Sequence, residues 1–252
     1  MSIRPTWRRW FEDFQKSVDA LALRQIDLGD ADKAELKSTA LALFARLYSE
    51  LETALVLVDA KRELAFRNAC RSVIDCALHL YAAETDPNYL ARLKEDDEHS
   101  RRSRAKRHLA ANEGRLAKES ASVLNGFIKR MQGPKQRLQV SEIDSPMPRL
   151  NHIYREISAD ALHVSWTSLH RHVVKGKNGD VRLTFEPKVT REELEESASI
   201  LAFSLLAAMR SLLIILPEIG ETYNLPTLFE SYKKIYKTGL RKYSHVNSDS
   251  RT

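Results

Sequence analysis

The sequence predicts an all-α protein, a multi-helix bundle with one small β-hairpin near residues 173–186. Three observations support this fold class. Glycine and proline, which interrupt helices, number only 8 each in 252 residues and cluster in a few places. Most of the remaining chain repeats apolar residues every three or four positions, the period of a helix with one buried side. One Asn-Gly pair, Asn178-Gly179, lies between two short strand-forming runs and is typical of a hairpin turn.

The first two predicted helices carry narrow apolar seams. One helix is capped by Thr6 and runs to about Leu28, and the next begins near Asp30 or Asp32 and continues to about Val58. The seam of the first comprises Trp7, Phe11, Phe14, Val18 and Leu21. Two consecutive seams favour either an antiparallel helix pair or a contact between two copies. We expect residues 1–29 to form an N-terminal helical extension, 30–245 the helical domain, and 246–252 a frayed tail.

The middle of the chain is predicted to contain further helices and one long loop. A third helix covers about Arg62 to Ala83 and ends ahead of Pro87, because the residue before proline avoids the helical conformation. Residues 88–130 form either one long helix or two shorter ones. Residues 133–149 hold three of the prolines and are expected to be the loop between the two halves of the domain.

The last third of the chain contains the hairpin and the most apolar helix. A helix from about Asn151 to His172 leads into the hairpin, and Thr190 with Glu193 forms a capping box for the helix that follows. The stretch from Ala198 to Ile219 is nearly long enough to cross a membrane. Its central Arg210 is costly in lipid, so we expect a buried core helix. A last helix, from about Leu225 to Tyr243, carries five Lys and Arg residues.

Composition restricts the class of protein. With 43% hydrophobic and 29% charged residues, the chain is expected to be globular. Lys and Arg exceed Asp and Glu by 40 to 34, and the resulting charge of +6 mildly favours polyanionic partners. The segment Met1–Phe14 has no apolar signal core, and Cys70 and Cys76 point in different directions on one helix. We therefore expect a reducing, cytoplasmic location.

A stripe of polar residues occurs in the third predicted helix. Asn68, Arg71, Asp75 and His79 follow one another at three- and four-residue steps and share one face. Apolar neighbours lie beside them, and a buried arginine must be paired, here with Asp75. One interpretation is an Arg71 that positions a phosphate, with Asp75 orienting it and His79 carrying a proton. The other is a structural ion pair that fixes the packing of the helix.

The segment around residue 100 is the best candidate for binding phosphates. An acidic run at residues 95–98 is followed by a group of cations: Arg101, Arg102, Arg104, Lys106 and Arg107. Arg102 and His108 would suit metal-independent cleavage of RNA, in which histidine transfers a proton and arginine stabilises the charged transition state. A solvated charge run is the alternative interpretation.

A third polar group lies in the helix that precedes the hairpin. On a regular helix Tyr154, Ser158 and Ser165 share a side, whereas His163 falls nearly opposite. One site with both Ser158 and His163 therefore needs a helix irregularity or a neighbouring helix. His163 and His170 are two turns apart, too far to chelate one metal, so we expect neither a metal nor a cofactor. The sequence has no nucleophile elbow, Gly-rich phosphate loop or dinucleotide fingerprint.

Two of these segments together resemble a family of bacterial helical proteins. In that family a helix with an Arg-x3-acid motif, here Arg71-Ser-Val-Ile-Asp75, is followed much later by a helix with Tyr, Ser and His. Tyr154-x3-Ser158 and His163-Val-Ser165 correspond to the later helix, and the resemblance extends over about Lys33 to His172. The family is similar to the HEPN-type all-helical proteins, many of which are RNases of toxin–antitoxin or phage-defence systems. Their signature, an Arg followed by a polar residue and a His, is met loosely by Arg102 and His108.

The resemblance implies a HEPN-like effector that binds RNA or cleaves it without a metal. The catalytic residues would come from Arg71, Asp75, His79, His163, Arg102 and His108, and the positioning residues from Tyr154, Ser158 and Ser165. The alternative is a non-catalytic helical dimer or adaptor that recruits a protein partner. We expect a homodimer or a protein partner in either case, and no stable insertion into a membrane.

Overall fold

The computed structural model describes residues 2–22, 25–29, 31–131, 138, 143, 148–159, 165–176, 180–187, 189–222 and 225–246. The described residues are helical apart from short connections and one two-stranded hairpin, which confirms the predicted all-α class. The chain divides into two compact units. Unit 1 comprises residues 1–84 and 144–252, and unit 2 comprises residues 85–143. This division differs from the predicted boundary near residue 30.

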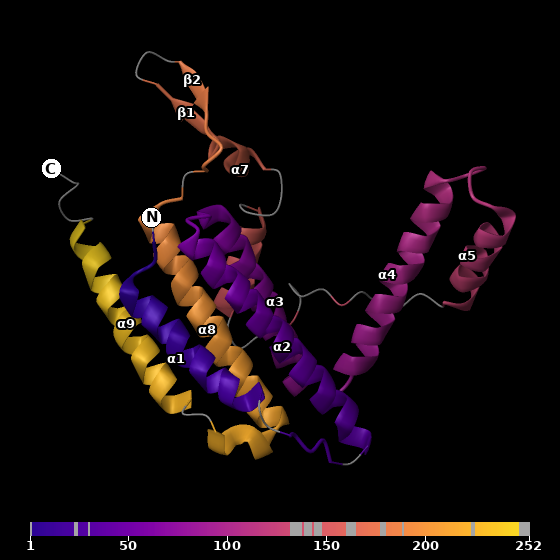
Figure 1. The fold of residues 1–252 in the computed structure, drawn as a ribbon, viewed down its shortest axis with the longest axis horizontal. Coiled ribbons are helices and arrows are strands. Elements are labelled where there is room, and N and C mark those ends of the chain that lie inside the picture. The colour runs from indigo at the N-terminus through magenta and orange to yellow at the C-terminus, as the bar shows by residue number, and fades with distance from the viewer. Residues whose placement is uncertain are drawn as a thin grey trace. The chain divides into compact units, whose positions relative to one another are not determined.

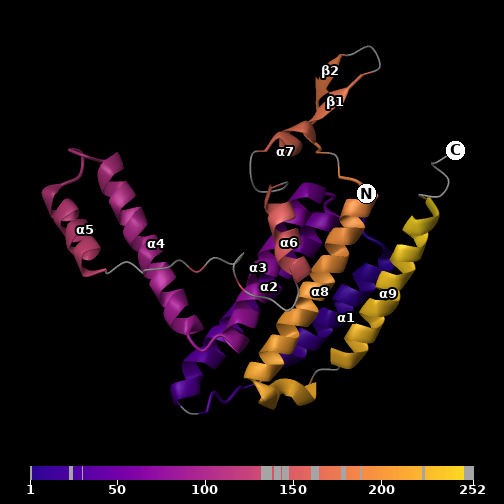
Figure 2. The same cartoon turned by 180° about the vertical axis from the view of Figure 1, so that it is seen from behind.

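Unit 1 is a bundle of long helices arranged around α8 (Figures 1 and 2). The helices are α1 (Pro5–Ala22), α2 (Ala31–Asp59), α3 (Glu63–Thr85), α6 (Pro148–Ile157), α8 (Arg191–Ile215) and α9 (Leu225–Val246), with the 3-10 helix η3 (Pro217–Thr222). Helix α8 packs against α1, α2, α9 and η3, and α1 also lies along α9. The second view shows α6 beside α3 and α8.

Helix α1 is part of the core of unit 1. Phe11 and Phe14 are completely buried, and Trp10 is 2% exposed. The indole N–H of Trp10 donates to the backbone oxygen of Leu228 at 3.0 Å, so its polar group is satisfied inside the bundle. The segment 1–29, predicted as an N-terminal extension, thus contributes α1 to the core of unit 1. Its apolar seam packs against the chain's own helices, and the same face is not available to a second copy.

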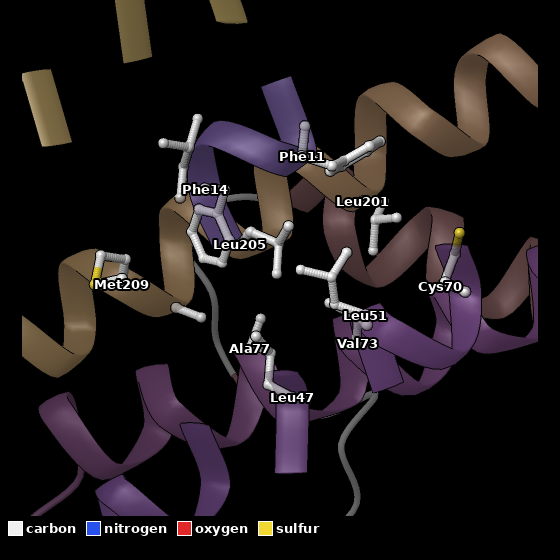
Figure 3. Close-up of a cluster of buried hydrophobic side chains, with 14 of the residues drawn as sticks. Phe11, Phe14, Leu47, Leu51, Cys70, Val73, Ala77, Leu201, Leu205 and Met209 are labelled. Carbon is white, nitrogen blue, oxygen red and sulfur yellow. The ribbon is translucent and has the colours of Figure 1, made fainter. Parts of the chain in front are cut away.

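The core joins side chains from helices that are far apart in the sequence (Figure 3). Its centre comprises Phe11, Phe14, Leu47, Leu51, Cys70, Val73, Ala77, Leu201, Leu205 and Met209. Cys70 and Cys76 are both buried and free, as expected from their positions on one helix. Burial raises the pKa of the Cys70 thiol, and it raises that of Cys76 to about 11. Both thiols therefore stay protonated and unreactive at neutral pH.

Helix α8 has the capping box that the sequence predicts. The Thr190 hydroxyl accepts from the Glu193 N–H at 3.2 Å, and the Glu193 carboxylate accepts from the Thr190 N–H at 2.7 Å. Among the described helices, α8 alone is long and apolar enough to cross a membrane, yet 67% of its most apolar stretch is buried inside the structure. This burial is typical of a core helix. Arg210 donates to the Glu84 carboxylate at 3.1 Å.

The described part of unit 2 contains two helices, α4 (Tyr89–Ala111) and α5 (Lys118–Arg130). The sequence left open one helix or two. The chain turns between them at Gly114, whose φ of 72° lies in the left-handed region that glycine adopts readily. The helices pack against each other, but Tyr89 and Ala105 are their only buried residues. Most of the predicted loop at residues 133–149 lies outside the described residues.

The helix predicted from Asn151 to His172 is interrupted, which corrects that prediction. Helix α6 ends at Ile157, and the next two residues form a wider π-helical turn. Ser165 then caps a short helix, α7 (Trp166–His170), by accepting from the Ser168 N–H at 3.1 Å. Ser165 therefore does not continue the side of the helix that carries Tyr154.

The predicted hairpin is formed by β1 (Val173–Lys175) and β2 (Val181–Leu183). The strands are antiparallel, with Val173 opposite Leu183 and Lys175 opposite Val181. All three β2 residues are exposed. Helix α7 and the hairpin extend beyond the ends of the bundle helices in both views (Figures 1 and 2).

Candidate functional site

The polar stripe predicted on the third helix lies on α3 and is half-buried. Its four members, Asn68, Arg71, Asp75 and His79, are all of intermediate exposure. Ile74 and Leu78 beside them are 0% and 1% exposed. The stripe is therefore partly removed from water, so its charged groups need partners inside the protein.

Arg71 reaches from α3 to two hydroxyl groups at the end of α6. Its Nε donates to Ser158 Oγ and its Nη2 donates to the Tyr154 hydroxyl, both at 2.6 Å. The guanidinium carbon lies 4.5 Å from the centre of the Tyr154 ring, which is within range of a cation–π interaction. The Ser158 hydroxyl in turn donates to the backbone oxygen of Tyr154 at 2.6 Å. The structure thus joins the two motifs on which the family resemblance depends.

Asp75 joins this cluster through Tyr154. Partial burial raises the pKa of the Tyr154 phenol, and the charge of Asp75 and its hydrogen bond with the phenol raise it further, while the charge of Arg71 lowers it. The net shift is upward, so the phenol stays protonated at neutral pH. A protonated phenol accepts from Arg71 and donates to Asp75 at the same time. Asp75 therefore balances the charge of Arg71 through the tyrosine.

This arrangement holds α6 against α3. The apolar residues of α6 beside this cluster are buried, with Leu150, Ile153 and Ile157 between 2% and 7% exposed. These contacts fix the orientation of the Arg71 guanidinium, as binding of a phosphate requires. However, its Nε and Nη2 groups already donate to hydroxyl groups within the protein. A phosphate at Arg71 would have to replace Tyr154 or Ser158 as the acceptor, or use the remaining guanidinium N–H groups.

Of the histidines expected to carry protons, the structure places only His79 relative to Arg71. His79 lies two turns further along α3, about 12 Å along the helix axis. His108 belongs to unit 2, and His163 lies outside the described residues. Within the described residues, no group of three or more His, Cys, Asp or Glu residues is placed to hold a metal ion.

The basic run lies on the second half of α4 and is mostly exposed. Exposed residues are Arg101, Arg104, Lys106, Arg107 and His108, and Arg102 is half-buried. Asp97 pairs with Arg101 at 2.8 Å, and Ser103 accepts from Arg107 at 3.1 Å. Acidic residues in the first half of a helix and basic ones in the second complement its macrodipole, so part of this pattern serves local stability.

Arg102 and His108 are not presented to one phosphate by α4. They are six positions apart on one helix, so their side chains differ in direction by about 120° and by about 9 Å along the axis. Arg102 is half-buried, whereas His108 is exposed. Within one copy of the protein, the pair therefore lacks the convergence that cleavage of a single phosphodiester requires.

Helix α5 adds to the positive surface, and the sequence analysis missed this. Lys118, Lys129 and Arg130 are exposed. Residues 99–131 hold nine Lys and Arg but only two Asp and Glu. Unit 2 as a whole holds thirteen Lys and Arg and eight Asp and Glu, a net charge of +5 out of +6 for the chain. This concentration of positive charge is evident in the sequence when the net charge is counted for each segment and not only for the whole chain.

Comparison with family models, with curated proteins and with solved structures finds no match for this chain. The family resemblance therefore depends on the motifs themselves.

Proposed function

We propose that this protein binds RNA through a cationic surface on unit 2. The surface comprises Arg101, Arg104, Lys106 and Arg107 of α4 and Lys118, Lys129 and Arg130 of α5. One observation carries the proposal: five of the six net positive charges fall within unit 2. Clustered, exposed Lys and Arg are the electrostatic basis of binding to a phosphate backbone.

The spacing of the cations on α4 suits a backbone. Arg101 and Arg104 are followed by the imidazole of His108 at three- and four-residue steps, so these three polar side chains lie along one face of the helix. They extend over about 10 Å of helix, enough to approach more than one phosphate of a single strand. Contacts of this kind position a nucleic acid without reading its sequence. RNA, and not DNA, is proposed because of the resemblance to HEPN-type proteins.

The same resemblance supplies a narrower version of the proposal. In it the protein is a cytoplasmic effector of a bacterial defence or toxin–antitoxin system that cleaves the RNA it binds. Arg71, held by Tyr154 and Ser158, would then position a phosphate. The present contacts of Arg71 explain a brace between α3 and α6 equally well, so binding is the primary proposal and cleavage is tested separately.

Binding is tested by fluorescence anisotropy with a labelled single-stranded RNA at several salt concentrations. With four or five phosphate contacts, the logarithm of the affinity should fall with the logarithm of salt with a slope of about −3. The variant Arg101→Gln/Arg104→Gln/Arg107→Gln should bind at least about tenfold more weakly and show a shallower slope. The same measurement with single-stranded DNA tests the preference for RNA.

A control variant removes the same charge from unit 1. Arg9, Lys16 and Arg46 are exposed on α1 and α2. Changing all three to glutamine lowers the net charge equally but leaves unit 2 unaltered, so its affinity for RNA should remain close to that of the wild type. Equal losses in the two triple variants would show that only total charge matters, and the proposed surface would be wrong.

Cleavage is tested by incubating the protein with total RNA and with tRNA in EDTA. If RNA is cut and the product disappears in one of the variants His79→Ala, His108→Ala or His163→Ala, that histidine carries the proton. RNA that stays intact under conditions where it is bound would restrict the function to binding. The adaptor alternative would then gain weight, with a protein partner on a surface other than the buried seams of α1 and α2.

A further inference from the structure

A cleft of about 1210 Å³ lies in unit 1 where the turn between α2 and α3 meets the start of α8. One wall comprises residues 60–65 and Asn68, at the end of α2 and the beginning of α3. The other comprises residues 185–187, which follow β2, and residues 189–192 at the start of α8. A concave site of this size can hold a small organic ligand.

Three exposed cations line this cleft: Lys61, Arg62 and Arg191. In the described part of the chain, none of these three side chains has a hydrogen bond or an ion pair. Asn68, the first member of the polar stripe on α3, adds a half-buried amide to the same wall. Ammonium, guanidinium and amide N–H groups that converge on one space are the donors that bind a phosphate group.

The local structure favours other residues at all three cationic positions. Lys61 has a φ of 57°, in the left-handed region where a helix end prefers glycine. The backbone oxygen of Arg62 accepts from the Phe66 N–H at 2.8 Å, so Arg62 occupies the N-cap of α3, where Ser, Thr, Asp and Asn are preferred. Arg191 is the first residue of α8, at the positive end of the helix dipole. Residues that depart from local preferences at one place point to a functional site.

Three carboxylates in the lining balance the three cations: Glu63, Glu186 and Glu192. Glu63 and Glu192 lie in the first turns of α3 and α8, where a carboxylate complements the helix dipole and so has a role in the fold. Because the lining is neutral in total, it does not attract a polyanion over a long range. Its cations act on a group that they contact, which favours a small ligand over an RNA backbone.

An aromatic ring lines the same cleft. Phe185 is 93% exposed, so its face is open to a flat ring of a ligand. Stacking on a protein ring is a common way to hold a nucleobase. We propose that the cleft binds a nucleoside phosphate, with its phosphate on Lys61, Arg62 and Arg191 and its base against Phe185. The proposal does not depend on RNA binding, because no residue of unit 2 takes part in it.

The first test is calorimetric titration of the full-length protein with ATP. The wild type should bind with a dissociation constant below about 1 mM. Lys61→Gln/Arg62→Gln/Arg191→Gln should weaken binding at least about tenfold, because the charge-assisted contacts are lost. The matched control is the triple glutamine variant of α1 and α2 described above, which removes the same charge elsewhere and should bind ATP as the wild type does. Absence of binding by the wild type, or equal losses in the two variants, overturns the proposal.

The second test separates the base from the phosphate. Phe185→Ala should weaken binding of ATP at least about fivefold through lost stacking, and it should leave the affinity for inorganic pyrophosphate unchanged. The side chain is almost fully exposed, so the fold should tolerate the substitution. An affinity for ATP that does not change would show that no base lies against the ring, and the assignment to a nucleoside phosphate would be wrong.

The third test distinguishes a ligand site from a role in the fold. Lys61→Gly places the preferred residue in the left-handed conformation, so the melting temperature should rise by about 2–4 °C. The same variant should bind ATP several-fold more weakly. A lower melting temperature with unchanged affinity for ATP would assign Lys61 to the fold and contradict its contact with phosphate.

The RNA titration keeps this proposal separate from the proposed function. The triple glutamine variant of the cleft should bind RNA as the wild type does, and the triple glutamine variant of α4 should bind ATP as the wild type does. Loss of RNA binding in the cleft variant would mean that the cleft holds part of the RNA, and the small ligand would be wrong.

Discussion

The two units are both helical, but different forces hold them together. Every residue of the large hydrophobic cluster belongs to unit 1. In the described part of unit 2, the buried apolar residues are Tyr89, Ala105, Leu138 and Ile143. Helices in proteins owe most of their stability to the packing of an apolar face, so unit 2 is expected to be the less stable of the two. The difference teaches that apolar packing accounts for the fold of unit 1 but for little of unit 2, whose charge is the basis of the proposed RNA binding.

The largest effect should come from removing an aromatic ring from the core of unit 1. Phe14 is completely buried between α1 and its neighbours, and Phe14→Ala should lower the free energy of unfolding by about 3–5 kcal/mol through lost burial and a residual cavity. Urea denaturation followed by circular dichroism measures this change.

The matched substitution in unit 2 is Leu124→Ala on α5, which is half-buried. It should cost less than about 1 kcal/mol, because little apolar surface is returned to water. A loss of stability as large as that of Phe14→Ala would mean that unit 2 has a core of its own, and the contrast between the units would be wrong.

Glu193 makes unit 1 sensitive to acid. Partial burial raises the pKa of its carboxyl group, but hydrogen bonds from Arg171 at 2.5 Å and from the Thr190 N–H at 2.7 Å, with the charges of Arg171 and Arg67, outweigh burial. They lower the pKa from 4.5 to about 2. Because the folded-state pKa is the lower one, this stabilisation is fully present above about pH 4.5 and is lost as the pH falls toward 2. The loss should be about 2 kcal/mol.

The measurement is urea denaturation of the wild type and of Glu193→Gln between pH 5.5 and pH 2 (about the two limits of the titration). The variant should be less stable than the wild type at pH 5.5, and the two should converge as the pH falls. Parallel curves would show that this carboxyl group does not link stability to pH.

Local patterns predicted most elements of the fold, because each depends on residues close together in the sequence. The capping box at Thr190, the hairpin around Asn178-Gly179 and the apolar α8 are of this kind. The π-helical turn at Ser158 was not predictable from periodicity. It lies where Arg71 binds the end of α6, a contact between residues 87 positions apart. The seam of α1 was ambiguous for the same reason, since a seam does not reveal whether its partner is the same chain.

A smaller effect is expected from the hydroxyl group of Tyr154. Tyr154→Phe keeps the ring beside Arg71 but removes the acceptor for Arg71 and the donor to Asp75. Unfolding free energy should fall by about 1–2 kcal/mol, because the half-buried charges lose a hydrogen-bonded partner. If the cluster is only a brace, RNA affinity and any RNase activity will be unchanged after correction for the folded fraction. A loss of activity without a loss of stability would instead support the phosphate-positioning role.

The smallest change in stability should come from Asp97, and it separates the two uses of charge in unit 2. Asp97 and Arg101 are 52% and 57% exposed in side-chain terms, and an exposed pair of this spacing contributes only about 0.3–0.5 kcal/mol. Asp97→Asn should therefore leave the unfolding transition almost unchanged.

The same substitution releases Arg101 and removes a negative charge beside the cationic surface. RNA should therefore bind about twofold to threefold more tightly at low salt, and this gain in affinity should disappear at high salt. Anisotropy titrations at the two salt concentrations measure it. Tighter binding with constant stability would mean that the charges of unit 2 act on a ligand, whereas a large loss of stability with unchanged affinity would assign them to the fold of α4.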